Sequence, residues 1–408
     1  MGTNGHGPNA TDGNADVTDE RADVIVVGAG PAGSAAAVAL ARAGQRVLLL
    51  DRAAFPRDKP CGDLIGARAM AAARRLGIAE SDLAPYERLR GAFVVADGGD
   101  LDLSPQTRLG QSVLSRSDAR VIPRTVFDAA MVGAARRAGA ELRQVNVRGV
   151  SGWQEGERTV SGRSSAGDVT LRARAIVIAG GYGSRLAPEL ASQSDRPAGP
   201  PRGIAMRGYF TGVTAPANRI AFTLNDWVLP GYGWVFPLPD GGANVGVGTL
   251  TEGGADEHLH ALYDRFVDDP ASPAAGWLRD AEPTGRPRSW PLDLGPRPRR
   301  VIADGLVAVG EAASLVGPLT GAGIAFALKS GARAGEVLAD ALQEGDVRTD
   351  DLTPYARFVS RRCLPWLRAE GVAQRWLTDP RHLQRLVRTV RPLPPTATLG
   401  ARLLLHLG

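Results

Sequence analysis

The feature that most constrains the fold is a glycine-rich turn between an apolar run and an alanine-rich segment. Residues 24–27 predict a strand buried on both faces, and residues 28–33 follow it with the spacing Gly-x-Gly-x-x-Gly. Residues 34–43 predict a helix that packs closely on a sheet, and residues 47–50 predict a second buried strand that ends at Asp51. This strand–helix–strand unit predicts an α/β nucleotide-binding domain.

Each part of this unit has a physical role in holding a dinucleotide. Gly28 permits the tight turn, Gly30 lets the backbone approach a pyrophosphate, and Gly33 lets helix and strand pack closely. The helix N-terminus offers free N–H groups and a favourable dipole for phosphate. Asp51, 23 positions after Gly28, can accept hydrogen bonds from the adenosine ribose. The residues expected at the cofactor are Gly28, Gly30, Pro31, Ala32, Gly33, Asp51 and Arg52.

Patterns further along the chain predict a second, antiparallel unit. Apolar runs at 175–179 and 306–309 predict buried strands, and residues 124–138 and 323–342 predict helices, whereas short alternating segments fill 203–249. We therefore expect an α/β plus antiparallel β fold, in which a Rossmann-like domain is interleaved with a β-sheet substrate domain and followed by a helical C-terminal segment. The expected parts are a disordered tail (1–20), the nucleotide-binding domain (21–90, 116–190 and 286–345), the substrate domain (91–115 and 191–285) and the C-terminal segment (346–408).

Composition narrows the class of protein. The net charge is +5, but the basic residues are distributed and no aromatic-interleaved basic run occurs, so nucleic-acid binding is not expected. The two cysteines, Cys61 and Cys363, form no spaced ligand set, and His258 and His260 stand two apart without an acid or cysteine cluster that completes a ligand set, so no metal site is expected. No apolar run approaches the roughly 18–20 residues of a membrane span, and no secretory signal is visible. A cytoplasmic location is the expectation.

Further motifs follow the glycine turn in a fixed order. They are Lys-Pro-Cys-Gly-Asp at 59–63, Arg124 with Phe127 and Asp128, Gly-Tyr-Gly-Trp-Val-Phe-Pro at 231–237, Val-Gly-Glu-Ala-Ala at 309–313, and Pro-Leu-Thr-Gly-Ala-Gly-Ile at 318–324. On these motifs the chain resembles the flavoproteins of the p-hydroxybenzoate hydroxylase fold and, within them, the geranylgeranyl reductase family, over roughly residues 22 to 345. The resemblance implies bound FAD, with NAD(P)H or another electron donor binding transiently.

The resemblance also implies which later residues hold FAD. Gly310 and Glu311 take the place of a glycine–acid pair that binds the ribityl chain, where the family usually has Asp. Residues 318–324 resemble the segment that faces the flavin ring, where backbone N–H groups and a helix N-terminus stabilise negative charge. The family commonly has Asp where Gly181 stands, which weakens the expectation of conventional nicotinamide docking. The further cofactor residues expected are Cys61, Gly62, Asp63, Arg124, Val147, Gly310, Glu311, Pro318, Gly321, Ala322, Gly323 and Ile324.

Two of these positions carry alternatives. Cys61 either contacts flavin or substrate, or is a small buried apolar residue, and the neighbouring Lys59 either balances the charge of reduced flavin or is solvated. Arg124 either contacts the FAD diphosphate or ribose, or is an exposed arginine at a helix start. The residues expected to take part in catalysis are Cys61, Tyr232 and Trp234.

An aromatic strand is the expected substrate surface. Tyr232, Trp234 and Phe236 alternate along the chain and therefore share one face, where they either line an apolar pocket above the flavin or fill the core between domains. Arg207 and Tyr209 share a face on another strand and complete the expected substrate-binding set.

The resemblance implies reduction of a carbon–carbon double bond in an apolar, isoprenoid-like substrate, with hydride from N5 of reduced flavin and an unidentified acid. The same architecture supports a monooxygenase, a hydroxylase or epoxidase that acts through a flavin C4a-hydroperoxide on a natural-product-like substrate. A third alternative is a non-redox binding protein or cyclase that retains FAD. The halogenase pattern Trp-x-Trp-x-Ile is absent, since residues 234–237 are Trp-Val-Phe-Pro. The basic and apolar segment 361–368 either packs on the FAD domain or touches a membrane.

Overall fold

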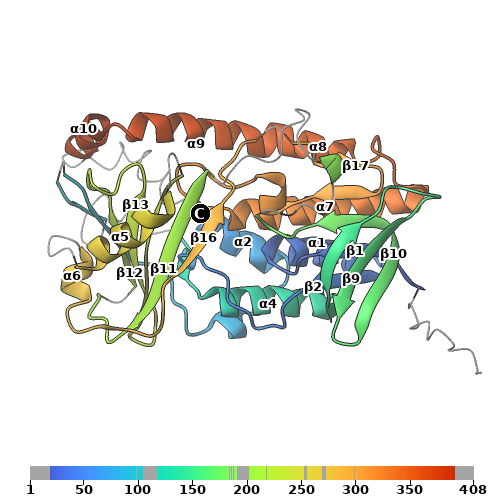
Figure 1. The fold of residues 1–408 in the computed structure, drawn as a ribbon, viewed down its shortest axis with the longest axis horizontal. Coiled ribbons are helices and arrows are strands. Elements are labelled where there is room, and N and C mark those ends of the chain that lie inside the picture. The colour runs from blue at the N-terminus through green and yellow to red at the C-terminus, as the bar shows by residue number, and fades with distance from the viewer. Residues whose placement is uncertain are drawn as a thin grey trace, which may run out of the picture.

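Two sheets stand beside one another, and helices cover them (Figure 1). The computed structural model describes residues 19–97, 99–103, 117–182, 184, 186, 188–190, 202–216, 218–251, 255–268, 273–297 and 299–390. Of the expected disordered tail only Asp19 and Glu20 are described, and both lie in the first strand. The rest of that tail, most of the expected segment 91–115 and the last residues of the chain lie outside the described residues.

The first sheet is the nucleotide-binding sheet, and its strand order is β17-β18-β10-β1-β2-β7. The central strands β18, β10, β1, β2 and β7 run parallel, while β9 and β8 extend β10 in antiparallel fashion. Parallel neighbours are the expected product of strand–helix–strand crossovers. The strands are β1 (Asp19–Val27), β2 (Val47–Asp51), β7 (Glu141–Gln144), β8 (Asn146–Val150), β9 (Arg158–Ser164), β10 (Gly167–Ile178), β17 (Ile302–Ala303) and β18 (Leu306–Ala308).

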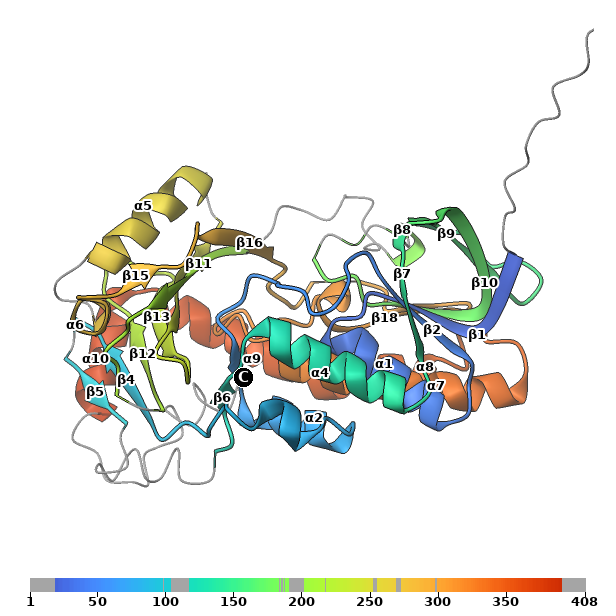
Figure 2. The ribbon, with the colours of Figure 1, turned by 90° about the horizontal axis from the view of Figure 1, so that it is seen from below.

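Small side chains allow the helices to pack tightly on this sheet. Helix α1 (Pro31–Arg42) begins with proline at its first turn, as fits a residue that has no N–H to satisfy, and it is buried along most of its length. It packs against α7 (Ile324–Glu344), while α4 (Arg124–Arg137) and α2 (Ala67–Arg75) lie alongside (Figure 2). The core between them is rich in alanine, valine and leucine.

The second sheet has the strand order β15-β11-β14-β13-β12-β4-β5, with β16 also paired to β11. Helix α5 (Ala255–Asp268) covers one face, where Leu259 and Phe266 are buried, and α6 (Pro273–Trp277) follows. Because β16 belongs to this sheet, the sheet continues beyond residue 285, where the sequence analysis places its end. Its strands are β4 (Gly91–Val95), β5 (Leu101–Asp102), β11 (Gly203–Thr211), β12 (Arg219–Thr223), β13 (Tyr232–Pro237), β14 (Ala243–Leu250), β15 (Glu282–Pro283) and β16 (Arg288–Leu292).

Short elements connect the two sheets. A two-stranded ladder joins β3 (Leu64–Ile65) to β6 (Arg120–Val121), so the segment after β2 and the segment before α4 lie together. The single-turn helices η1 (Glu80–Leu83) and η2 (Pro188–Leu190) lie on connections to the second sheet, and a third, η3 (Gly310–Ala313), lies between β18 and α7. The interleaving expected from the sequence is confirmed, because the chain enters the second sheet from the first and returns to it.

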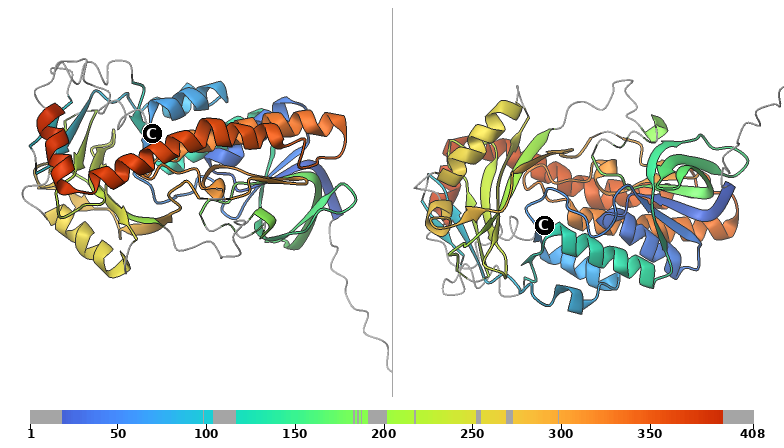
Figure 3. Two further views of the ribbon diagram at one scale, coloured as in Figure 1. Left: turned by 90° about the horizontal axis from the view of Figure 1, so that it is seen from above. Right: turned by 60° about the horizontal axis from the view of Figure 1, so that its bottom comes forward.

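The C-terminal helices form a bridge over both sheets. They are α8 (Thr353–Phe358), η4 (Val359–Cys363), α9 (Leu364–Leu377) and α10 (Pro380–Val390). Figure 3 shows these helices, in red, running past both sheets. Leu367 of α9 is buried in the core of the first sheet, whereas Leu377 packs with Leu383 and Val387 of α10 near β4 and β5. Within the described part of the chain, no helix is both long and apolar enough to cross a membrane.

Candidate active site

The glycine turn forms a cradle at the N-terminus of α1. Gly28 has a φ of 105°, and a methyl group on Gly33 would overlap the carbonyl oxygen of Gly28, so neither position accepts a side chain. At Gly30 only the Arg57 guanidinium lies within reach, 3.4 Å from an added methyl, and the first turn of α1 carries no acidic residue. The helix end is therefore open to an anion.

Asp51 and a group of charged side chains border this cradle. Asp51 accepts hydrogen bonds from the backbone N–H of Ala29 at 2.9 Å and of Ala53 at 3.0 Å, which fixes its carboxylate beside the turn. Arg57 lies 3.6 Å from Asp51 and 3.2 Å from Asp128, so it bridges β2 and α4. Its guanidinium is the described cation nearest the open face of Gly30, where a diphosphate would lie.

Arg124 is a buried arginine and not an exposed helix-start residue. It is only 5% exposed, and its guanidinium forms two 2.7 Å hydrogen bonds with the Asp128 carboxylate. Asp128 and the Cys61 thiol, which lies near the guanidinium, favour its charged form and hold the pKa of Arg124 above its ordinary value, although burial opposes this. Arg124 thus joins the cradle to Cys61.

Asp63 anchors the segment 61–63 to the second sheet. Its carboxylate accepts hydrogen bonds from Tyr209 Oη at 2.6 Å, from Asn244 Nδ2 at 2.8 Å and from the Arg124 backbone N–H at 3.2 Å. Burial raises the pKa of Asp63 to about 6, and the hydrogen bonds from Tyr209 and Asn244 oppose that rise. The same contact holds the pKa of Tyr209 above its ordinary value, because both burial and the neighbouring carboxylate disfavour the phenolate. Since the carboxylate is satisfied by protein donors, direct contact between Asp63 and FAD stays a prediction.

Asn244 completes this network from β14. Its amide also donates to the carbonyl oxygen of Cys61 at 2.7 Å, and its own carbonyl accepts from Trp234 Nε1 at 2.9 Å. The backbone of Gly62 lies against the rings of Trp234 and Phe236. The motif at 59–63 is thus held on the aromatic face of β13.

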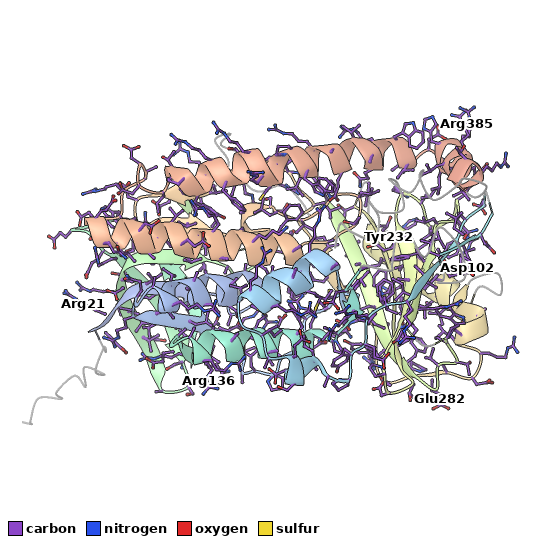
Figure 4. All side chains as sticks on the ribbon, turned by 180° about the vertical axis from the view of Figure 1, so that it is seen from behind. Arg21, Asp102, Arg136, Tyr232, Glu282 and Arg385 are labelled. Carbon is purple, nitrogen blue, oxygen red and sulfur yellow. The ribbon has the colours of Figure 1, made fainter. Side chains whose placement is uncertain are left out.

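The three aromatic residues of β13 share one face, as the alternation predicts, but their burial differs. Trp234 and Phe236 are 4% and 3% exposed and pack with Phe222, so they fill the core beneath the segment 61–63. Tyr232 is partly buried at the junction of the second sheet with the helices (Figure 4). Its hydroxyl donates to the carbonyl oxygen of Thr320 at 2.6 Å.

The turn 317–323 lies between Tyr232 and α7. The turn closes on itself, because the Gly321 N–H donates to the Gly317 carbonyl and the Gly317 N–H donates to the Ala322 carbonyl, both at 2.9 Å. Helix α7 begins directly after it at Ile324, with no acidic residue in its first turn. The segment expected to face the flavin thus ends at a second helix N-terminus that favours negative charge.

The two positions that depart from the family pattern lie together. Glu311 Oε2 is 3.2 Å from Lys59 Nζ, and a methyl group on Gly181 would lie 3.4 Å from the same carboxylate oxygen. Lys59 is therefore partnered and not free in solvent, and it also lies 5.5 Å from the centre of the Trp290 ring. The longer acid at 311 reaches the space beside Gly181, where the family commonly has Asp.

Arg207 and Tyr209 stand on β11, and their side chains stack, with the guanidinium carbon 4.2 Å from the ring centre. Arg207 pairs with Asp58 at 2.5 Å, and Arg288 of β16 joins the same carboxylate at 2.8 Å. Arg207 is 4% exposed, so it ties the segment before Lys59 to the second sheet. A direct contact with substrate stays a prediction for both residues.

Two further expected cofactor residues, Arg52 and Val147, lie on or directly after strands of the first sheet. Arg52 is exposed, and its backbone carbonyl accepts from the Gln144 side chain. Val147 lies on β8 opposite Gly162, whereas Val145 donates its backbone N–H to the Asp51 carbonyl at 2.8 Å. Contacts of Arg52 and Val147 with FAD stay predictions.

Sequence reasoning missed three residues that the structure brings to this site. Asn244 had a visible signal, because it is a polar residue in an apolar strand. Glu370, which accepts a hydrogen bond from Thr320 in the turn 317–323, also had one, because it is the lone acid of α9. Arg57 had none, since no spacing or pattern distinguishes it from Arg52 and Lys59 nearby. Among the described residues, no group of three or more His, Cys, Asp or Glu side chains is arranged to hold a metal ion.

These residues fit FAD. The open helix end at Gly30 and the Arg57 guanidinium suit a diphosphate, Asp51 suits a ribose, and Glu311 suits a ribityl chain. The turn 317–323 and the start of α7 suit the electron-rich edge of a flavin ring.

Comparison with known proteins agrees with this assignment. The family "FAD binding domain" matches residues 21–199, and the family "Geranylgeranyl reductase catalytic domain" matches residues 203–276. A menaquinone reductase of Mycobacterium tuberculosis is 35% identical over 332 residues, which cover 78% of this chain and 77% of that protein. Digeranylgeranylglycerophospholipid reductase 1 of Methanopyrus kandleri is 32% identical over 346 residues, covering 82% and 84%.

Solved structures share the whole fold. A geranylgeranyl bacteriochlorophyll reductase-like protein of Thermoplasma acidophilum superposes with a TM-score of 0.81 at 24% identity, covering 94% of this chain and 95% of that one. A flavin-dependent brominase superposes with a TM-score of 0.75 at 20% identity, covering 95% and 93%. At these identities the likeness concerns the fold alone.

Proposed function

The chain belongs to the geranylgeranyl reductase family of FAD-dependent oxidoreductases, and we propose that it reduces carbon–carbon double bonds in the isoprenoid chain of a lipid. It is an FAD-dependent enzyme. The named substrates of the two relatives, menaquinone and a digeranylgeranyl phospholipid, are both molecules with isoprenoid chains. A polyprenyl chain attached to a polar head group is therefore the substrate class proposed here.

The observation that carries this proposal is the contact between the aromatic strand and the turn expected to face the flavin. Tyr232 donates to Thr320 in that turn and lies 5.9 Å, centre to centre, from the Phe222 ring. An apolar, aromatic wall beside a flavin suits an isoprenoid chain, which offers only apolar surface and double bonds. Such a wall can orient a double bond without polar contacts.

Bound FAD supplies the hydride in this reaction, and the residues of the chain hold the reactants. Arg57 and the N-terminus of α1 would bind the diphosphate, and Asp51 the ribose. Lys59 is close enough to Glu311 to offset its charge beside Gly181. Since the sequence carries one dinucleotide fingerprint, we propose that NAD(P)H or another donor reduces the flavin and then leaves.

Turnover without oxygen tests the proposal. Enzyme with pre-reduced FAD is mixed anaerobically with a panel of polyprenyl quinones, polyprenyl glycerolipids and short aromatic compounds. The masses of the products are then measured by mass spectrometry. We expect a gain of two hydrogens per double bond in a polyprenyl lipid. A product that gains oxygen, and forms only in air, would show a monooxygenase instead. Turnover that is unchanged when the flavin stays oxidised would show a non-redox role.

We also propose that the outer surface of α9 and α10 contacts an anionic membrane that carries the substrate. Among the described residues, Val372 and Trp376 are the large apolar side chains with high exposure, at 60% and 45%. Arg385 projects from the outer end of α10 (Figure 4). Exposed apolar groups ringed by arginine suit an anionic bilayer surface. The exposed arginines of α9 and α10 are Arg368, Arg375, Arg381, Arg385 and Arg388.

Sedimentation with lipid vesicles tests the membrane contact. We expect binding to vesicles that contain anionic lipid, weaker binding to neutral vesicles or at high salt, and loss of binding in Trp376→Glu. Glu336→Gln on α7, which lies outside this surface, serves as the matched control and should bind as wild type. Equal binding by wild type and Trp376→Glu would contradict the contact. The cytoplasmic location expected from the sequence stays a prediction.

A further inference from the structure

Helix α9 carries a buried carboxyl group that none of the roles above uses. Glu370 is 1% exposed, and it lies between Leu367, which packs in the core of the first sheet, and Leu377, which packs near the second. Among the described residues no basic side chain forms an ion pair with it, and its Oε1 atom has no hydrogen-bond partner. Burying an acid with an unpaired oxygen costs free energy of folding. The groups that surround it therefore indicate its role.

Those surroundings are the turn 317–323. Glu370 Oε2 accepts from Thr320 Oγ1 at 3.3 Å, and Thr320 Oγ1 in turn accepts from the Ala322 backbone N–H at 3.2 Å. A methyl group on Gly317 would overlap Glu370 Oε2, so the carboxylate lies directly on the backbone of the turn. From the opposite side, Tyr232 donates to the Thr320 carbonyl. The turn is therefore held between α9 and β13.

The charge of Glu370 changes close to neutral pH. Burial raises its pKa to about 7, while the Thr320 hydroxyl, the backbone N–H groups of Leu319 and Thr320, and Trp366 oppose that rise. From β13 it faces Tyr232, whose own pKa is raised by burial first and also by the Glu370 carboxylate. From α2 the Arg68 guanidinium stacks on the Trp366 ring at 4.8 Å. Above neutral pH a negative charge thus lies against the turn, and below it the charge is gone.

We propose that Glu370 is a positioning residue for the flavin: it fixes the turn 317–323 through Thr320, and the gain or loss of its proton changes the reduction potential of the flavin that this turn contacts. The start of α7 favours negative charge on a reduced flavin. The Glu370 carboxylate on the same turn acts against that effect, because like charges repel and water is excluded here. The inference rests on the proposed placement of the flavin beside the turn.

The test compares the reduction potential of bound FAD in wild type and Glu370→Gln from pH 6 to pH 8.5, together with the absorbance spectrum of the oxidised flavin. Glutamine has the shape of the protonated acid and does not titrate. At pH 8 and a fixed solution potential, we expect the ratio of reduced to oxidised flavin to be about tenfold higher in the variant. This corresponds to a reduction potential that is higher by about 30 mV for a two-electron couple. At pH 6 the two proteins should agree within about twofold, since Glu370 is then mostly protonated.

Two comparisons separate charge from position. Glu336→Gln on the exposed side of α7 is the matched control and should follow wild type at every pH. Thr320→Val removes the hydrogen bond but keeps the charge, so it should alter the flavin spectrum and retain the inflection near pH 7. An unchanged flavin spectrum in Thr320→Val would contradict the positioning role, which keeps the test valid even where Glu370→Gln fails to fold.

An unchanged potential in Glu370→Gln at all pH values, or an inflection that persists in this variant, would overturn the inference. Both outcomes leave FAD bound and reducible, so the proposed function would stand. Failure of the wild-type protein to bind or reduce FAD would instead overturn the proposed function.

Discussion

Gly30 and Gly33 belong to one glycine turn, yet the structure assigns them different sensitivities. An alanine methyl at Gly33 overlaps the Gly28 carbonyl, whereas at Gly30 it meets only the Arg57 guanidinium. We predict that Gly33→Ala lowers the free energy of unfolding by at least about 2 kcal/mol. Gly30→Ala should change it by less than about 1 kcal/mol but weaken FAD binding at least about tenfold, because the methyl occupies the diphosphate position.

Urea unfolding of the FAD-free proteins and fluorescence titration with FAD measure these two effects separately. Gly152→Ala is the matched control, since a methyl there meets nothing within 4 Å. If Gly30→Ala binds FAD as tightly as the control does, the cradle does not hold the diphosphate.

Asp63 makes stability depend on pH. Burial raises its pKa from 3.8 to about 6, so the folded protein holds the proton more tightly than the unfolded chain. Stability from this group is therefore fully present below pH 4 and lost as pH rises to about 6. The size of the shift corresponds to about 3 kcal/mol. We predict that the unfolding free energies of wild type and Asp63→Asn are not parallel between pH 4.5 and pH 7.5. As pH rises over this range, wild type should lose about 2 kcal/mol relative to the variant.

Other titrating groups cancel in that difference, since both proteins carry them. The variant itself loses stability at every pH, because an asparagine amide cannot accept from both Tyr209 and Arg124 without presenting a donor to one of them. A difference that stays constant with pH would mean that Asp63 titrates normally in the folded protein.

Helix α9 depends on a few buried contacts at the scale of the element. Leu367 is completely buried in the core of the first sheet, whereas Val372, on the same helix, is 60% exposed. We predict that Leu367→Ala lowers the free energy of unfolding by about 2–5 kcal/mol and Val372→Ala by less than about 0.5 kcal/mol. Thermal and urea unfolding of both variants measure this. Similar losses in the two would mean that α9 is not anchored through Leu367.

Elements whose periodicity is local could be predicted from the sequence. The apolar runs of β1 and β2 and the alternation of β13 give their burial directly, because each side chain's direction follows from its position along a strand. Contacts between distant segments could not be predicted from the sequence. Glu311 pairs with Lys59, 252 positions away, and Glu370 contacts the turn 317–323. Both contacts depend on how the chain folds back, which no local pattern predicts.

Expected boundaries fail for the same reason. Arg288–Leu292 shows no alternation that separates it from the first domain, and it joins the second sheet only because β11 offers a free edge. Arg124 shows a related limit. As a helix-start arginine it has the pattern of an exposed residue, and only the structure shows that Asp128, one turn later, neutralises it in the interior.

At the scale of the whole molecule, the two sheets are joined by polar contacts as well as by helices. Arg207 pairs with Asp58, Asn244 binds Asp63, and Tyr232 binds the turn that precedes α7. In each case a residue of the second sheet holds a segment that borders the cofactor cradle. The proposed substrate surface and the proposed FAD site are therefore positioned by the same contacts. A substitution in one of them should also alter the other.

This arrangement predicts that FAD stabilises both sheets together. A ligand that binds only the folded protein adds about 2.7 kcal/mol at a concentration one hundred times its Kd. We predict a single calorimetric transition for the FAD-free protein, with equal calorimetric and van't Hoff enthalpies, and a single transition at higher temperature with FAD. FMN lacks the adenosine and one phosphate, so it cannot use Asp51 or the full α1 cradle and should shift the transition less. Two transitions, of which FAD moves only one, would mean that the contacts through Asp58, Asp63 and Thr320 are too weak to couple the sheets. A tightly coupled second sheet cannot unfold while the first sheet holds its ligand.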